Sequence, residues 1–274
     1  MATTREIVIE VPTALVGGRI VDTSDRQPLA GVSLTLTSDA TELERLPIHT
    51  ATTDLEGKFE FGNVADGTWR LAASKKGYAA VSRSVTVQTQ RATGDLDLTM
   101  DPTEGLTLEA RLPSGGIPSE VRVAVLDPAG GALLAGEYAT GEHGSVRLSS
   151  VPPGTWSIVV SAGGSATTTV QAQAPGATIT VALPPATALR VSVPELGKTG
   201  SMATASVADS GGRPFHSLTW DGRPQREFRM AGGQLEFASL PPGSWKVTVA
   251  APDGQTWTGT ATTTPGTTTN LNLE

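Results

Sequence analysis

The sequence predicts an all-β protein of three tandem antiparallel Greek-key-type β-sandwich modules joined by short Pro-containing linkers. The first observation is a six-residue sequence motif containing Gly-Thr-Trp or Gly-Ser-Trp, which occurs three times, as residues 66–71, 153–158 and 242–247. Copies about 90 residues apart correspond to one small β-domain per copy. The second is alternation of apolar and polar residues with period two, while helical periodicity is nearly absent. The third is the abundance of turn formers, with 31 Gly and 19 Pro in 274 residues.

The alternating runs are short and are separated by turn signals. Residues 32–37, 120–126 and 246–250 each place apolar side chains on one face and polar ones on the other. The runs are separated by Gly- and Pro-containing turns, which fall at residues 113–116, 127–131, 210–212 and 252–254. Strands of this length and spacing are typical of an antiparallel sandwich.

Each module ends with an alternating strand, and the first two end strands lead into a linker that contains proline. Residues 95–100 lead into Asp101-Pro102, and residues 178–183 lead into Pro184-Pro185. We therefore predict modules at residues 13–102, 103–185 and 186–274. Short linkers with proline are stiff, so we expect a monomeric rod whose modules unfold semi-independently unless their interfaces are large.

Residues 1–12 form a leading strand with two open interpretations. Glu6–Val11 followed by Pro12 has the form of a closing strand with its linker proline. It is either the remnant of an upstream module, in which case the chain is the C-terminal part of a longer protein, or an extra edge strand of the first module. The first residues also lack the apolar region of a signal peptide, which the upstream-module interpretation would explain.

The first module carries a set of motifs in a defined order. They are Gly18–Asp22, Gln27–Leu34, Thr53–Phe61, Gly67–Leu71 and Lys76–Tyr78. Their order and spacing resemble the carboxypeptidase regulatory-like domain, a transthyretin-like (prealbumin-like) β-sandwich. The departure is Trp69, where that family more often has Tyr. Modules two and three keep the Pro-Pro-Gly-x-Trp turn and strand, so they look like divergent relatives.

The motif residues also have local roles that do not depend on the family. Asp54–Gly57 is a turn, and we expect it to join residues 51–53 to residues 58–61 as a hairpin. Trp69, Trp156 and Trp245 are in phase with the apolar residues of their strands, which predicts that they face the core.

Composition excludes several classes of protein and favours one location. The net charge of −7 argues against a nucleic-acid binder that works by phosphate neutralisation. The chain has no cysteine, which excludes disulfides and thiolate metal sites. No apolar stretch approaches the roughly 20 residues of a membrane span. We expect a secreted, cell-surface or periplasmic protein.

The sequence gives little support to an enzyme. His49, His143 and His216 have no second ligand at metal-like spacing. Nucleophile-elbow and phosphate-loop motifs are missing, and the resemblance to a carboxypeptidase accessory domain brings no catalytic zinc domain. Acidic residues near turns show no calcium-loop spacing. We expect no catalytic residue, no metal and no cofactor.

The third module contains the best candidate for a recognition surface, the Arg- and aromatic-rich segment 213–230. Such residue types are enriched at interfaces, and Trp with Arg also suits carbohydrate or carboxylate ligands. The candidate binding residues, for a protein or glycan, are His216, Trp220, Arg223, Arg226, Arg229 and Trp257, the last expected to be partly exposed. The other interpretation is a long hairpin whose Phe215, Trp220 and Phe228 cover the local core.

The leading functional expectation is a non-catalytic structural or binding segment, a spacer or adhesion-type rod, of a larger secreted or surface bacterial protein. One alternative is an accessory segment of a secreted hydrolase that binds substrate or carbohydrate through the third module. The other is a structural component of an intracellular phage-tail-like assembly.

Overall fold

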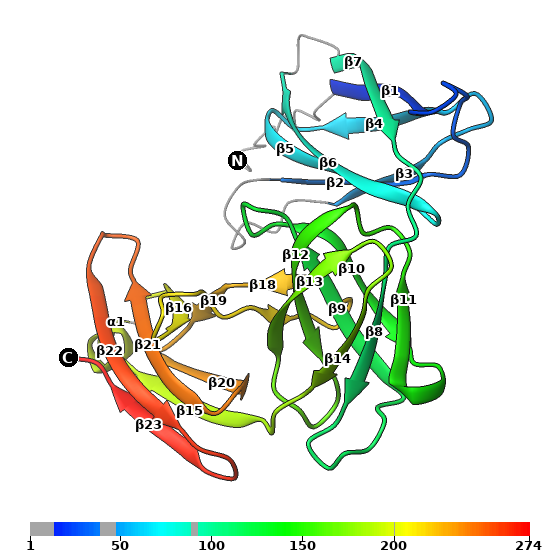
Figure 1. Ribbon diagram of the computed structural model, residues 1–274. Helices are drawn as coiled ribbons and strands as arrows, with labels where there is room; N and C mark the ends of the chain where they lie inside the picture. Colours follow the sequence, from blue (N-terminus) through cyan, green and yellow to red (C-terminus); the bar gives the residue numbers. More distant parts are fainter. Residues whose placement is uncertain (1–13, 39–47, 89–92, 200) are drawn as a thin grey trace, which may run out of the picture. The chain divides into compact units, whose positions relative to one another are not determined.

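The protein consists of β-sandwiches arranged in two compact units. The computed structural model describes residues 14–38, 48–88, 93–199 and 201–274. One unit ends at Pro102, and the other, Thr103–Glu274, contains two sandwiches (Figure 1). The tandem β-sandwich prediction is confirmed, whereas the predicted leading strand lies outside the described residues. The exact module limits stay predictions.

Module one has seven strands in two sheets. They are β1 (Ala14–Asp22), β2 (Ser33–Ser38), β3 (His49–Thr52), β4 (Lys58–Val64), β5 (Gly67–Lys75), β6 (Tyr78–Val87) and β7 (Thr93–Met100). One sheet has the order β4-β1-β7 and the other β3-β2-β5-β6.

Module two repeats this strand order. Its elements are β8 (Leu106–Arg111), β9 (Glu120–Leu126), β10 (Ala132–Ala139), the 3₁₀ turn η1 (Glu142–Gly144), β11 (Ser145–Leu148), β12 (Gly154–Ser161), β13 (Thr168–Ala174) and β14 (Thr178–Ala182). The sheets are β11-β8-β14 and β10-β9-β12-β13. The first strand again lies between the fourth and the seventh, and the fifth strand again carries the repeated Trp.

Module three has the same two sheets and one additional hairpin. Its elements are β15 (Thr187–Ser192), α1 (Pro194–Thr199), β16 (Ala203–Asp209), β17 (Ser217–Leu218), β18 (Pro224–Gln225), β19 (Glu227–Met230), β20 (Gln234–Leu240), β21 (Gly243–Ala250), β22 (Thr256–Thr263) and β23 (Thr268–Asn272). The sheets are β20-β15-β23 and β19-β16-β21-β22, and β17 pairs with β18. The β17–β18 hairpin is therefore an insertion between the second and third strands of the shared topology.

Two details differ from the sequence-based expectation. The first and last strands of every module pair in parallel, as β1 with β7, β8 with β14 and β15 with β23, so each smaller sheet is mixed and not purely antiparallel. The predicted hairpin across Asp54–Gly57 is wrong, because β3 and β4 belong to opposite sheets. The turn itself forms, with the Gly57 amide donating to the Asp54 carbonyl at 3.0 Å, but it carries the chain from one sheet to the other.

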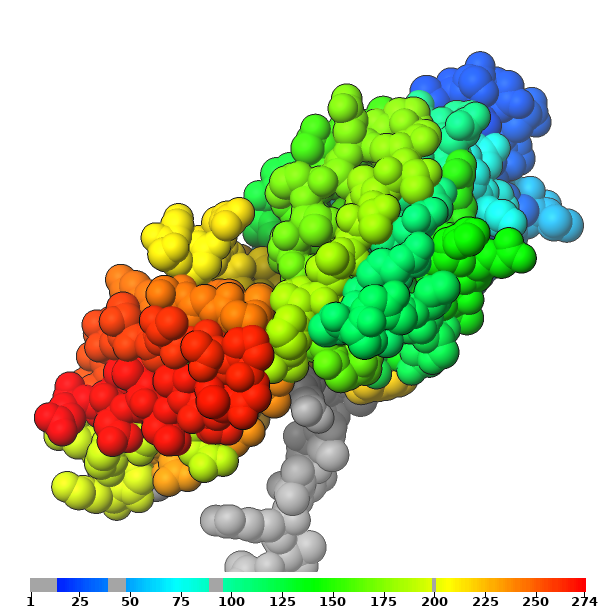
Figure 2. Space-filling view, turned by 60° about the horizontal axis from the view of Figure 1, so that its bottom comes forward, coloured from blue at the N-terminus to red at the C-terminus, as the bar shows by residue number. Residues whose placement is uncertain are grey.

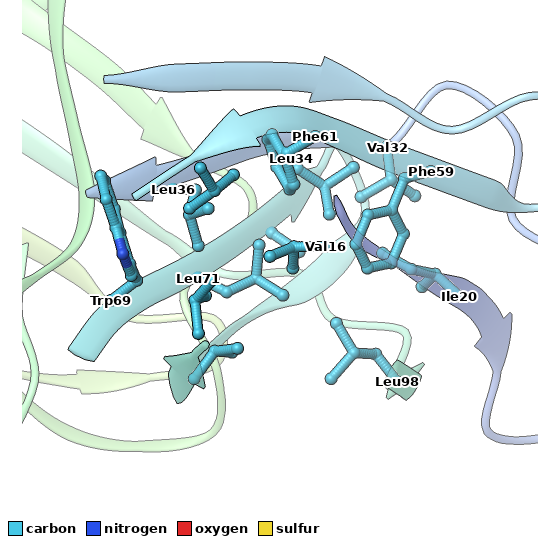
Figure 3. Packing of buried hydrophobic residues seen from close by; sticks show 14 of the residues in the cluster. Val16, Ile20, Val32, Leu34, Leu36, Phe59, Phe61, Trp69, Leu71 and Leu98 are labelled. Atoms are coloured by element: carbon cyan, nitrogen blue, oxygen red, sulfur yellow. The ribbon is translucent and has the colours of Figure 1, made fainter. Parts of the chain in front are cut away.

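The repeated Trp residues close the cores, as predicted, but to different extents. Trp69 is 1% exposed and packs in one cluster with Leu36, Leu71 and Phe61 (Figure 3). Trp245 is buried in the corresponding place of module three, whereas Trp156 is partly exposed.

Modules two and three are connected by more than their linker. The Ala166 amide donates to the Pro184 carbonyl within module two, and the neighbouring Thr167 amide donates to the carbonyl of Ser239 in module three at 2.9 Å. Figure 2 shows the green second module and the orange-to-red third module in contact. Among the described residues, neither helical segment has the length and apolar character that crossing a bilayer requires.

Candidate functional site

The candidate site is the insertion hairpin of module three, residues 217–225, which lies within the segment singled out by the sequence. Its turn is closed by two main-chain bonds, from Thr219 to the Arg223 carbonyl at 2.9 Å and from Gly222 to the Thr219 carbonyl at 3.0 Å. The Asp221 carboxylate accepts a short hydrogen bond from the Thr219 hydroxyl and lies 3.0 Å from the Arg223 guanidinium. The turn is therefore fixed by its own polar residues.

One side of the hairpin is buried against module two. Leu218 forms a buried apolar cluster with Ala124 and Leu126 of β9 and Val159 of β12. These three residues lie on the outer face of the β10-β9-β12-β13 sheet, opposite the face that carries Val123 and Val125. The outer face of the sheet of module two is thus covered by a strand of module three, which Figure 1 shows reaching the β12 region.

The hairpin turn also approaches the backbone of module two very closely. A Cβ atom at residue 222 would lie 2.4 Å from the carbonyl oxygen of Gly136 on β10, and Gly222 has φ +82°. Both the left-handed backbone and the lack of space require glycine there. The contact is made by main chain on main chain, so it depends on the position of the hairpin to within a few tenths of an ångström.

His216 lies at the base of the hairpin, in the same interface. It is 6% exposed, and neither of its buried ring nitrogens has a hydrogen-bond partner. A Cβ atom built on Gly130, in the β9–β10 turn of module two, would lie 4.0 Å from Nε2 of His216 and 3.4 Å from Arg226. Burial, and then the positive charge of Arg226, lower the pKa of His216 below 6.5, and the Pro214 carbonyl opposes this in part.

The structure separates the predicted binding residues into buried and exposed groups. Trp220 is 82% exposed at the tip of the hairpin, and Arg226 and Arg229 are also exposed. His216 is in the module interface, and Trp257, expected to be partly exposed, is buried in the core of module three. The six residues therefore do not form one surface, and a binding role stays a prediction that Trp220 is best placed to fulfil.

The two interpretations of the Arg- and aromatic-rich segment each describe part of it. Phe215 and Phe228 do cover the local core, with ring centroids 6.4 Å apart, and Phe215 also meets Trp245 edge-on at 5.7 Å. Trp220 takes no part in that core.

Sequence reasoning missed Leu218 and Gly222, although a signal was present on module two. Val123–Leu126 and Ile158–Val160 are apolar without interruption, which is the pattern of a strand buried on both faces. In module three the corresponding strand β21 alternates with Lys246 and Thr248. The difference indicates that the sheet of module two, unlike that of module three, is buried on its outer face as well.

A second concave feature lies in module three between α1 and the β21–β22 turn. It is a cleft of about 570 Å³ whose lining includes Glu195, Lys198, Met202, Asp253, Gln255 and Trp257. The Gln255 amide donates to Glu195 at 3.3 Å.

Carboxylates near turns are engaged by the backbone. Asp54 accepts the main-chain N–H groups of Glu56 and Lys58 at 3.0 and 2.8 Å. Asp22 accepts the Ser24 amide and hydroxyl and the Tyr78 hydroxyl. Within the part of the chain that the structure describes, no group of three or more His, Cys, Asp or Glu side chains is arranged to hold a metal ion.

Several solved structures resemble the chain in fold. The Bacillus anthracis TIE protein is 12% identical with a TM-score of 0.29, and the match covers 96% of this chain and 51% of that one, so the chain spans about half the length of this relative. A streptococcal ancillary pilin is 12% identical with a TM-score of 0.27, over 95% of this chain and 98% of the pilin. A cohesin–X-dockerin complex from Acetivibrio cellulolyticus is 25% identical with a TM-score of 0.23, over 33% of this chain and 59% of that one.

These TM-scores lie below 0.5, so the similarities assign no role. No curated protein sequence matches the chain. The family model that matches residues 16–101 is that of the carboxypeptidase regulatory-like domain. This range coincides with the first sandwich and contains all five motifs that resemble the family. The first module of this chain therefore matches the carboxypeptidase regulatory-like family both in its motifs and in its extent.

Proposed function

We propose that the chain is a non-catalytic structural segment of a larger secreted or surface bacterial protein, in which modules two and three act as one stiff spacer. The observation that carries the proposal is the docking of the insertion hairpin on the outer sheet of module two. A linker alone would leave neighbouring sandwiches free to rotate. The hairpin adds a second attachment through Leu218 and Gly222, and a spacer that must hold its length requires such an attachment.

Antibody labelling of intact and lysed cells of the source organism tests this role. An antibody raised against the purified chain should label intact cells, because a surface spacer is accessible from outside. Labelling that requires lysis, together with sedimentation of the protein in a large particle, would reject the surface role and favour the structural component of an intracellular assembly.

One observation favours recognition of a carbohydrate or protein as a second function. Trp220 projects into solvent from a hairpin whose base and turn are held against module two. A large aromatic side chain on a fixed support loses little conformational freedom on binding, which is a property of interface hot spots.

Replacement of Trp220 tests the recognition function. If the site binds a ligand found by screening glycans and candidate proteins, Trp220→Ala should weaken binding about 30-fold, equivalent to about 2 kcal/mol. The matched control is Leu55→Ala, because Leu55 of module one is also 82% exposed. Equal affinity of both variants and the unmodified protein, measured by titration calorimetry, would exclude Trp220 as a binding residue.

A further inference from the structure

We propose that the junction between modules two and three is an acid-sensitive clasp, which protonation of His216 opens. The clasp consists of the insertion hairpin, residues 217–225, His216 at its base and the outer sheet face of module two. This inference goes beyond the spacer role and does not depend on where the protein is located.

The geometry makes His216 the only titratable side chain buried at this interface among the residues that the structure describes. It lies between the buried Phe215 and the docked strand β17, so its ring cannot stay in place if the hairpin moves away. Both ring nitrogens are enclosed and without a hydrogen-bond partner. A neutral imidazole tolerates this at modest cost, whereas an imidazolium would bury a positive charge whose one favourable neighbour is the Pro214 carbonyl.

The charged groups around His216 do not offer compensation. Arg226 is the charged residue that acts on the ring, and its positive charge opposes protonation. The β9–β10 turn of module two carries Asp127, but its carboxylate already accepts the Ala129 and Gly131 amides at 2.9 Å.

The docking face itself adds little charge. Arg122 of β9 lies on it and is paired with Glu137 of β10 at 3.1 Å. The face is otherwise formed by neutral residues, namely Ala124, Leu126, Ser157 and Val159. An imidazolium at residue 216 therefore finds no free anion on either module among these neighbours.

The direction of the pH effect follows from the protons bound in each state. In the open state His216 is hydrated and has its ordinary pKa of about 6.5. In the docked state its pKa is lower, so the docked state binds fewer protons. Docking is therefore at full strength above about pH 6.5 and weakens as the pH falls below that value.

A cysteine at residue 124 reports the opening directly. Ala124 is fully buried under the hairpin, and the chain has no other cysteine. In full-length Ala124→Cys, reaction with a pyridyl disulfide requires the clasp to open. The labelling rate is compared with that of the same protein carrying His216→Phe, an uncharged ring of similar size, so that the pH dependence of the reagent cancels.

The labelling rate of Ala124→Cys, divided by that of the double variant Ala124→Cys/His216→Phe, should rise by up to about 30-fold as the pH falls from about 8 to about 5. His143→Asn is the matched control, because His143 is exposed in module two and its replacement should leave the rise unchanged. A ratio that stays constant with pH, or a rise that His143→Asn abolishes, would overturn the proposal.

A second measurement covers the case in which the cysteine itself loosens the interface. With three histidines in the chain, their ring-proton NMR signals can be followed individually in the unlabelled full-length protein. The signal of His216 should titrate below the ordinary range, and Leu218→Asp, which places a charge in the apolar cluster, should return it to about 6.5. Ordinary titration of His216 in the unmodified protein contradicts the clasp.

Discussion

At the scale of single residues, the repeated Gly-x-Trp motif forms the same local structure in each module. In each module the indole N–H donates to the carbonyl four residues earlier, from Trp69 to Ala65 at 2.9 Å, from Trp156 to Pro152 at 2.8 Å and from Trp245 to Pro241 at 3.1 Å. The intervening glycines have φ of +140°, +134° and +154°, which L-residues rarely adopt. Each Trp thus fixes the turn that precedes its own strand.

Substitution of the Trp residues separates packing from hydrogen bonding. Trp69→Ala and Trp245→Ala should each destabilise their module by about 3–5 kcal/mol, and Trp156→Ala by less, because Trp156 is partly exposed. Trp245→Phe keeps much of the apolar surface and loses the bond to Pro241, at a cost of about 1 kcal/mol from that bond. Urea denaturation followed by amide exchange in each module measures these values. Equal losses for all three Ala variants would contradict the burial pattern.

The sequence predicted the structure best at the scale of single residues. A glycine two positions before a Trp, preceded by Pro or Asp, predicted three modules, because both the turn and the buried ring are local properties of a few residues. The partial exposure of Trp156 could not be predicted this way, since it depends on residues brought together by the fold.

At the scale of elements, the insertion hairpin gives module three a property that the shared topology lacks. The strand order of all three modules is the same, so the apolar contact between modules two and three comes from the added β17–β18 hairpin. The sequence predicts a recognition surface for its residues, but not an interface between two modules of the same chain. The reason is physical: Leu218 acquires its role from Ala124 and Val159, which lie on a different module and are distant in sequence.

The close approach at Gly222 gives a sharp test of the docked hairpin. Gly222→Ala should make the cysteine reporter at residue 124 react at least about tenfold faster at neutral pH, because its Cβ would overlap Gly136. The control is Gly212→Ala, since Gly212 has a similar φ of +78° but no atom near its Cβ position. Equal labelling of the two variants would mean that backbone strain, and not contact with module two, determines the effect.

At the scale of the whole molecule, the chain divides after Pro102, and residues 103–274 form one compact unit. The sequence predicted three modules joined by stiff linkers and left the size of the interfaces between them open. The structure adds a direct attachment between the second and third, through the Thr167–Ser239 main-chain bond and the apolar cluster around Leu218. We therefore predict that modules two and three move as one body.

Residual dipolar couplings of the full-length protein in a dilute aligned medium at about pH 8 test this claim most directly. Amide couplings from residues 103–183 and 187–274 should fit one alignment tensor, because the clasp fixes the orientation of the two sandwiches. In Leu218→Asp the same two sets should require separate tensors, with each module still folded. Separate tensors already in the unmodified protein would contradict the account.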